Sequence, residues 1–184
     1  MTEISLNILD IAENSVKAGA TLVSIIIKAS TKNNILTVII SDNGCGMNEQ
    51  QLKNVTDPFF TTRTTRKVGL GVPFFKAAAE AAGGSFEITS SKNKGTSVTA
   101  TFEINNIDRM PLGDIAGTMH TLITMYNKTD FYFCIEVDDK KTELSTSRIK
   151  EILGDIPLQT PDVSNYIRDY LKENIAFVME EKII

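Results

Sequence analysis

The chain has 184 residues, enough for one large domain or for one of ordinary size with a small appendage. Its hydrophobic content of 42% and charged content of 23% are those of an average globular protein, so a disordered or fibrous chain is not expected. The net charge of -4 gives no electrostatic footprint for nucleic acid, and no segment runs long enough without charge to span a membrane.

The N-terminus and the cysteines favour the cytoplasm as the location. The first ten residues include Glu3 and Asp10 and no basic stretch, so a secretory signal is not expected. Cys45 and Cys134 lie far apart without paired spacing, which argues against a disulfide framework and against a zinc site. A reducing compartment is the simplest setting for such a chain.

Hydrophobic periodicity and turn residues predict regular elements along the whole chain. An apolar stripe at helical spacing predicts a helix over 4–18, which Gly19 ends. Two β-rich runs, 22–28 and 35–41, are joined by a turn at 32–34 and predict a hairpin. Before residue 105, the other expected elements are a short helix at 48–55, a mobile loop at 56–68, a helix from 69 to 82, and strands 85–90 and 96–104. A boundary is expected near 105–109. After it, we expect a helix near 112–127, a strand 131–137, a turn at 138–140 with a short strand after it, and helices near 146–153 and 162–180.

Three polar residues share one face of the first predicted helix. Asp10 and Asn14 are four residues apart, and Lys17 follows Asn14 by three. An Asn oxygen suits Mg²⁺, a Lys can meet a phosphate, and a carboxylate can orient or activate a water. A solvated helix face would explain the same stripe, so the pattern alone leaves both interpretations open.

A tight loop, Asp42-Asn43-Gly44-Cys45-Gly46, follows the second strand. A carboxylate at a strand end can accept a hydrogen bond from the amino group of adenine. Gly44 and Gly46 allow positive φ and the close approach of a flat ring. An ordinary Asp/Asn-Gly turn is the alternative explanation.

Two glycines, in Gly69-Leu70-Gly71, precede a predicted helix. Backbone N–H groups at a helix N-terminus can bind an anion. The segment is not a Walker A loop, because no Gly-Lys-Ser/Thr follows, and it lacks the third glycine of a Rossmann fingerprint.

The order of these pieces resembles the GHKL superfamily, which groups gyrase-type topoisomerases, heat-shock chaperone ATPases, histidine kinases and MutL. The resemblance covers Leu6 to about Phe102, a little over half of the chain. It implies a two-layer α/β (α+β) sandwich for residues 1–104, with a mixed, mainly antiparallel sheet covered by helices on one face. It leaves residues 105–184 as a small α+β C-terminal appendage of unknown role. The matching motifs are an N box at 10–17, a G1 box at 42–46, an F box at 57–63, a G2 box at 69–71 and a G3 box at 94–96.

The resemblance also implies an ATP–Mg²⁺ site. Asn14 would coordinate Mg²⁺ and Lys17 would contact phosphate, while Asp42, helped by Thr96, would bind the adenine amino group. Residues 57–68 would form an ATP lid that orders when nucleotide binds. Its candidates for closing on the phosphates are Arg63, Arg66 and Lys67. The expected nucleotide-binding residues are Asn14, Lys17, Asp42, Gly44, Gly46, Met47, Phe60, Thr61, Thr62, Arg63, Gly69, Leu70, Gly71, Val72 and Thr96.

Histidine kinases are the branch that the chain resembles most. Lys17 and the run Pro58-Phe59-Phe60 follow the kinase pattern, whereas Ala18-Gly19-Ala20 is similar to MutL. The chain departs from the kinases at Lys67-Val68, where they usually carry Gly-Thr, so the lid is expected to be stiffer or to hold phosphate differently.

Two further departures bear on catalysis. Asp10 is the candidate catalytic residue, but the hydrolysing branches of the superfamily carry a longer Glu at this position. The sole histidine, His120, lacks the surroundings of a phosphoacceptor, and an ordinary helix residue is the better interpretation.

These features lead to one functional hypothesis and two alternatives. We expect ATP–Mg²⁺ binding in signal transduction, by a histidine-kinase-like or regulatory kinase or a slow ATPase that acts on a separate partner protein. A non-catalytic ATP sensor is the alternative, favoured by Asp10 and by the missing acceptor histidine; a MutL-like ATPase is the third. Neither nucleic acid nor a membrane is expected as a partner, and a homodimer is left open.

The C-terminal part offers little chemistry of its own. Asp138, Asp139 and Glu143 could suggest a metal site, but a charged hairpin turn explains them more simply. Cys134 lies among aromatic and aliphatic residues, which favours a place in a strand core.

Overall fold

A computed structural model describes residues 3–56 and 71–180. The strands in these residues are β1 (Leu22–Ser30), β2 (Ile35–Asp42), β3 (Phe86–Ser91), β4 (Gly95–Glu103), β5 (Asp130–Val137) and β6 (Lys140–Ser145). The helices are α1 (Ile4–Lys17), α2 (Glu49–Asn54), α3 (Gly71–Ala81), α4 (Ile115–Met125), α5 (Thr146–Leu153) and α6 (Pro161–Met179). Among these helices, none has the length and the apolar character that crossing a bilayer requires.

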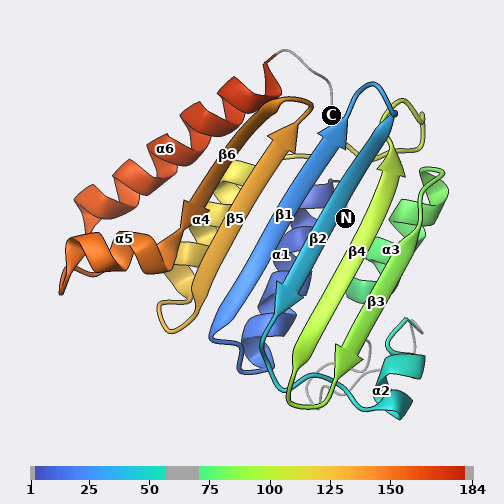
Figure 1. The fold of residues 1–184 in the computed structure, drawn as a ribbon, viewed down its shortest axis with the longest axis horizontal. Helices are drawn as coiled ribbons and strands as arrows, with labels where there is room; N and C mark the ends of the chain where they lie inside the picture. The colour runs from blue at the N-terminus through green and yellow to red at the C-terminus, as the bar shows by residue number, and fades with distance from the viewer. Residues whose placement is uncertain (1–2, 57–70, 181–184) are drawn as a thin grey trace.

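The described strands form a single sheet in the order β3-β4-β2-β1-β5-β6 (Figure 1). Neighbouring strands are antiparallel except for β1 and β5, which run parallel. Helices α1, α3 and α4 cover one face of this sheet (Figure 1), and α6 packs against α4 and the outer strands β5 and β6. The predicted two-layer fold, with a mixed and mainly antiparallel sheet, is confirmed.

Strict alternation of side chains explains why the sheet is covered on one face only. In β1, Val23, Ile25 and Ile27 are buried against the helices, while the residues between them point to the other face. The helix side of the core is supplied by α1, whose Ile8 and Ile11 recur at the spacing of one helical face. Burying each such side chain stabilises the fold by about 1.5–3 kcal/mol, so the apolar contacts between the sheet and α1 hold the two layers together.

The residues after 104 extend the same sheet. Strand β5 pairs with β1 along its whole length, and the buried Thr129 hydroxyl donates to the Ala20 carbonyl oxygen at 3.0 Å. This parallel pairing was not predicted, because no local pattern in the sequence specifies a partner strand so far away in the chain. The division into two domains at residue 104 stays a prediction.

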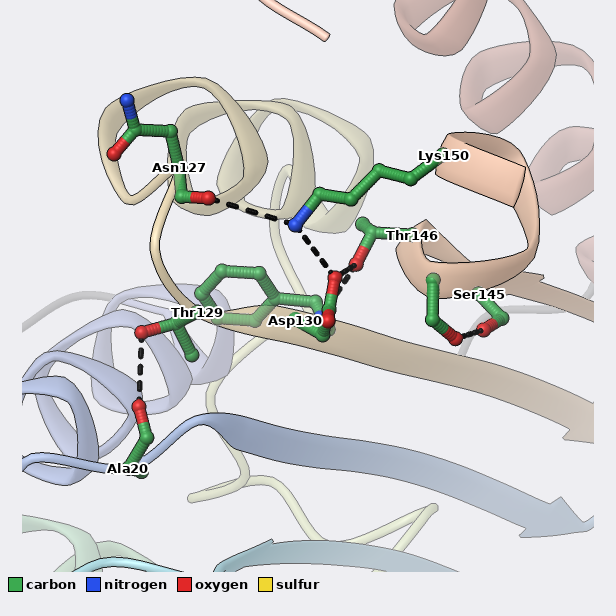
Figure 2. Close-up of polar contacts among 9 residues, drawn as sticks. Ala20, Asn127, Thr129, Asp130, Ser145, Thr146 and Lys150 are labelled. Carbon is green, nitrogen blue, oxygen red and sulfur yellow. Dashed lines mark hydrogen bonds and ion pairs between the residues drawn. The ribbon is translucent and has the colours of Figure 1, made fainter. Parts of the chain in front are cut away.

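A cluster of polar contacts fixes α5 to the start of β5 (Figure 2). The Thr146 hydroxyl donates to Asp130 Oδ1 at 2.8 Å and accepts from the buried Phe131 N–H at 2.8 Å. Lys150 Nζ lies 2.7 Å from the same Asp130 oxygen and 3.5 Å from the Asn127 carbonyl oxygen. Burial alone would raise the pKa of Asp130, but the hydrogen bonds from Lys150 and Thr146 outweigh it and lower the pKa below its usual value.

Replacing Thr146 by Val is expected to lower the free energy of unfolding by about 2–4 kcal/mol. Thr146 is 1% exposed, so the isosteric change would leave the Phe131 N–H buried without its partner and remove a donor from a charged carboxylate. Urea unfolding followed by circular dichroism would measure the loss. Thr146→Ser, which keeps the hydroxyl, should lose only about 1 kcal/mol; equal losses would contradict the role of the hydrogen bonds.

Candidate functional site

A cavity of about 400 Å³ opens between α1, the loop after β2, α2, the start of α3 and strands β3 and β4. Its volume is in the range of small-molecule sites. Much of its wall is apolar and is formed by residues that were not expected to bind nucleotide: Ile11, Ile40, Val55, Ile88 and Val98.

Eight of the residues expected to bind nucleotide line this cavity: Asn14, Lys17, Asp42, Gly46, Met47, Gly71, Val72 and Thr96. Asp10 and Gly44 are not among its lining residues. The expected lid, with Phe60, Thr61, Thr62 and Arg63, lies outside the described residues, as do Gly69 and Leu70.

The Asp42 carboxylate, at the end of β2, is held by three donors from three parts of the chain. Ser15 Oγ lies 2.6 Å from Asp42 Oδ2, and the backbone N–H groups of Gly44 and Thr96 donate to Oδ1 at 2.9 and 3.3 Å. The Ile11 carbonyl oxygen is 3.3 Å from the same Ser15 oxygen, so the hydroxyl proton goes to the nearer, charged acceptor. These bonds fix one orientation of the carboxylate at the cavity wall.

The loop after Asp42 keeps its shape through Asn43 and Gly46. The Asn43 side-chain oxygen accepts from the N–H groups of Thr21 and Leu22 at 2.9 and 3.0 Å, which ties the end of β2 to the start of β1. Gly46 has a φ of 61°, and a Cβ there would lie 2.0 Å from the Ser91 carbonyl oxygen. Asn43 therefore has a structural role, and only glycine fits at position 46.

A hydroxyl pair orients the Thr96 side chain. Ser90 Oγ donates to the Gly95 carbonyl oxygen at 2.9 Å and accepts from the Met47 N–H at 2.9 Å. The Thr96 hydroxyl, 2.9 Å away, must then donate to Ser90. Its lone pairs are left to accept a hydrogen bond from a donor in the cavity. Ser15 and Ser90 were missed in the sequence, because their contacts join segments far apart.

Lys17 is the last residue of α1 and lines the cavity. Its ammonium group is 2.8 Å from Glu13 Oε2, and its side chain is about half exposed. Glu13, the partner of Lys17, also acts on Tyr126: burial, and then the negative charge of Glu13, raise the pKa of the Tyr126 hydroxyl. An exposed ion pair of this kind is worth about 0–1 kcal/mol, so an anionic ligand could readily recruit Lys17.

Asp10 lies against the first residue of α3. A Cβ on Gly71 would be 1.8 Å from Asp10 Oδ2, so the carboxylate occupies the space that a side chain would need. Within residues 3–56 and 71–180, no group of three or more His, Cys, Asp or Glu side chains could hold a metal ion. Asn14 lines the cavity and carries an amide oxygen, a ligand suited to Mg²⁺, which commonly takes few protein ligands together with phosphate oxygens.

A cavity of this size, lined by a fixed carboxylate, a lysine and the first residues of a helix, has the features of a nucleotide-binding site. The chain belongs to the family described as histidine kinase-, DNA gyrase B- and HSP90-like ATPase, whose model matches residues 2–106.

Two relatives from bacteria are also similar to part of this chain. A protein of Shewanella frigidimarina described as a sensor protein is 34% identical over 103 residues, which are 55% of this chain and 16% of that protein. A protein of Bacillus subtilis described as a C4-dicarboxylate sensor kinase is 31% identical over 70 residues, 38% of this chain and 13% of that one. The chain thus spans less than a fifth of either relative's length.

The fold is also similar to a solved structure, the N-terminal domain of a DNA repair protein. The TM-score is 0.58 at 15% identity, and the match covers 84% of this chain and 58% of that chain. At this identity the likeness concerns the fold alone.

Proposed function

We propose that the chain binds ATP with Mg²⁺ in the cavity beside Asp42 and acts in signalling on a separate partner protein. It would do so as a histidine-kinase-like or regulatory kinase, or as a slow ATPase. The observation that carries this proposal is the Asp42 carboxylate, which three donors hold ready to accept from an amino group. The two free cysteines fit a cytoplasmic location.

Different residues of the cavity would contact different parts of the nucleotide. Asp42 and Thr96 would accept from the adenine amino group, directly or through water. Lys17 would leave Glu13 to contact a phosphate, and the N-terminus of α3 would add its dipole. Asn14 would hold Mg²⁺, which when bound neutralises charge on the phosphate oxygens.

A non-catalytic ATP sensor is the second candidate, and the position of Asp10 favours it. The Asp10 carboxylate contacts Gly71 and is not among the residues that line the cavity. A general base must come within hydrogen-bond reach of the water that it activates. If Asp10 stays against α3 when nucleotide binds, the protein would retain ATP without turning it over.

Calorimetric titration with a non-hydrolysable ATP analogue and Mg²⁺ tests the proposal. Saturable binding of one nucleotide per chain is expected, and no binding at millimolar nucleotide would contradict it. Phosphate release from ATP then separates the candidates: release above the protein-free rate supports the enzyme, and saturable binding without release supports the sensor.

The Asn14→Ala variant is expected to lose the gain in affinity that Mg²⁺ confers, at least about tenfold. The affinity measured with EDTA should stay close to that of the wild type, because the other contacts are untouched. The same titration, run with and without Mg²⁺, gives both values. Asn105→Ala, at an exposed position outside the cavity, is the control. A Mg²⁺ effect of wild-type size in Asn14→Ala would show that another group holds the ion.

A further inference from the structure

A second cavity, of about 580 Å³, lies in the C-terminal part between β6, α5 and α6. Buried Leu144 and Ile167 form its floor, and Ile149, Val163 and Tyr170 form its walls. None of these residues falls within the segment that matches the ATPase family, residues 2–106. We call this cavity the C-terminal groove.

The apolar surface of the C-terminal groove continues beyond it. Ile152 and Tyr166 line the groove and are 84% and 68% exposed, and Ile156, in the connection between α5 and α6, is 50% exposed. A small molecule within the groove would leave these protruding side chains in water. A polypeptide lying along the groove would cover them, and exposed aromatic and aliphatic side chains around a pocket are typical anchors of such interfaces.

The charged side chains around the groove indicate which charge a partner should carry. Asp155 and Asp162 are exposed, and among the described residues neither of them has an ion pair. Asp162 lines the groove, and Asp155 precedes the exposed Ile156 in the connection between α5 and α6.

The basic residues nearby lie beside carboxylates. Lys150 is bonded to Asp130 at 2.7 Å, and Glu143 is shared by Lys141 at 2.9 Å and Arg148 at 3.7 Å. Together with Asp155 and Asp162, these groups are four carboxylates and three cations, so the net charge around the groove is negative and favours a positively charged partner.

We propose that the C-terminal groove binds an amphipathic helix of a partner protein, with apolar side chains at helical spacing in the groove and Lys or Arg beside Asp155 and Asp162. An apolar groove that takes side chains at positions i, i+3 or i+4 and i+7 is an established mode of helix recognition. A helix suits the groove better than an added strand, because the Glu143 carbonyl oxygen of the edge strand β6 already accepts from the Tyr170 hydroxyl and α6 packs against β6.

A pair of matched peptides tests the proposal. Both are fluorescent 18-residue helices with the same leucine face, and their polar face carries lysine in one and glutamate in the other. Fluorescence polarisation with the full chain is expected to give saturable binding of the leucine/lysine peptide, at least about tenfold tighter than that of the leucine/glutamate peptide. No saturable binding of either peptide up to 200 µM would overturn the proposal, where ~200 µM corresponds to about 5 kcal/mol of binding free energy.

Ile152→Asp separates docking in the groove from general attraction between opposite charges. The substitution adds a negative charge at a position 84% exposed, so it should not disturb the fold. General attraction would strengthen the binding of the leucine/lysine peptide, whereas docking in the groove predicts a loss of at least about tenfold. Ile107→Asp, at a position 96% exposed and outside the groove, is the matched control and should bind as the wild type does or slightly tighter. Equal binding by the two variants would overturn the proposal.

Discussion

A Gly95→Ala variant is expected to lose about 2–5 kcal/mol of the free energy of unfolding. Gly95 has a φ of 98°, and a Cβ there would lie 1.9 Å from the Asp42 carbonyl oxygen and 2.9 Å from Asn43 Cα. Both contacts are with backbone, which cannot turn aside as a flexible side chain would. Strands β2 and β4 would have to separate where Asp42 pairs with Thr96, so the same change should also weaken nucleotide binding.

Gly154→Ala separates the strain of a positive φ from the lack of space. Gly154 has a φ of 60°, but no atom lies within 4 Å of the position that a Cβ would take. This control should therefore lose only about 1–2 kcal/mol. Urea unfolding curves of the two variants and the wild type give the comparison. A loss in Gly95→Ala no larger than that in Gly154→Ala would contradict the close approach of β2 and β4.

The elements could be predicted from the sequence because their signals are local. The helix expected over 4–18 is α1 (Ile4–Lys17), and the hairpin expected around residues 32–34 is β1–β2. The apolar spacing of a helix face and the residues of a tight turn act over a few positions, so the chain shows them directly.

Contacts between distant segments could not be predicted in this way. Ser15 and Asp42 are 27 residues apart, and Thr96 is 54 residues from Asp42. The order of motifs indicated that Asp42 and Thr96 belong to one site, but it gave no hint of Ser15, because a serine on a helix has many possible partners. The pairing of β5 with β1 was missed for the same reason, as was the groove between α5 and α6.

Asn14, Lys17, Asp42 and Thr96 were expected together from the motifs, and they line one cavity. Their roles toward a ligand stay predictions. Asp10 shows the limit of the motif: its position on the helix was clear, but whether its carboxylate faces the cavity depends on α3, which packs beside α1.

An Asp42→Asn variant is expected to bind ATP roughly 100-fold more weakly while keeping its fold. The Gly44 and Thr96 N–H groups both point at one carboxylate oxygen, so the amide oxygen of Asn must take that place. The amide nitrogen then faces Ser15, whose hydroxyl can accept from it and donate to the Ile11 carbonyl oxygen, 3.3 Å away. The network is satisfied again, and the stability loss should be about 1 kcal/mol.

The same amide nitrogen would oppose the adenine amino group, because two donors would meet where a donor met an acceptor. An inosine triphosphate analogue carries a carbonyl oxygen at that position and should lose much less affinity. The ratio of the affinity for the ATP analogue to that for the inosine analogue should therefore decrease or fall below one. Calorimetric titration of both nucleotides, with Asp108→Asn at an exposed position as the control, measures the change. If Asp42→Asn bound the ATP analogue within about threefold of the wild type, which is less than 1 kcal/mol, Asp42 could not be the group that recognises the base. The cavity would then have to recognise its ligand through its apolar walls and Lys17 alone.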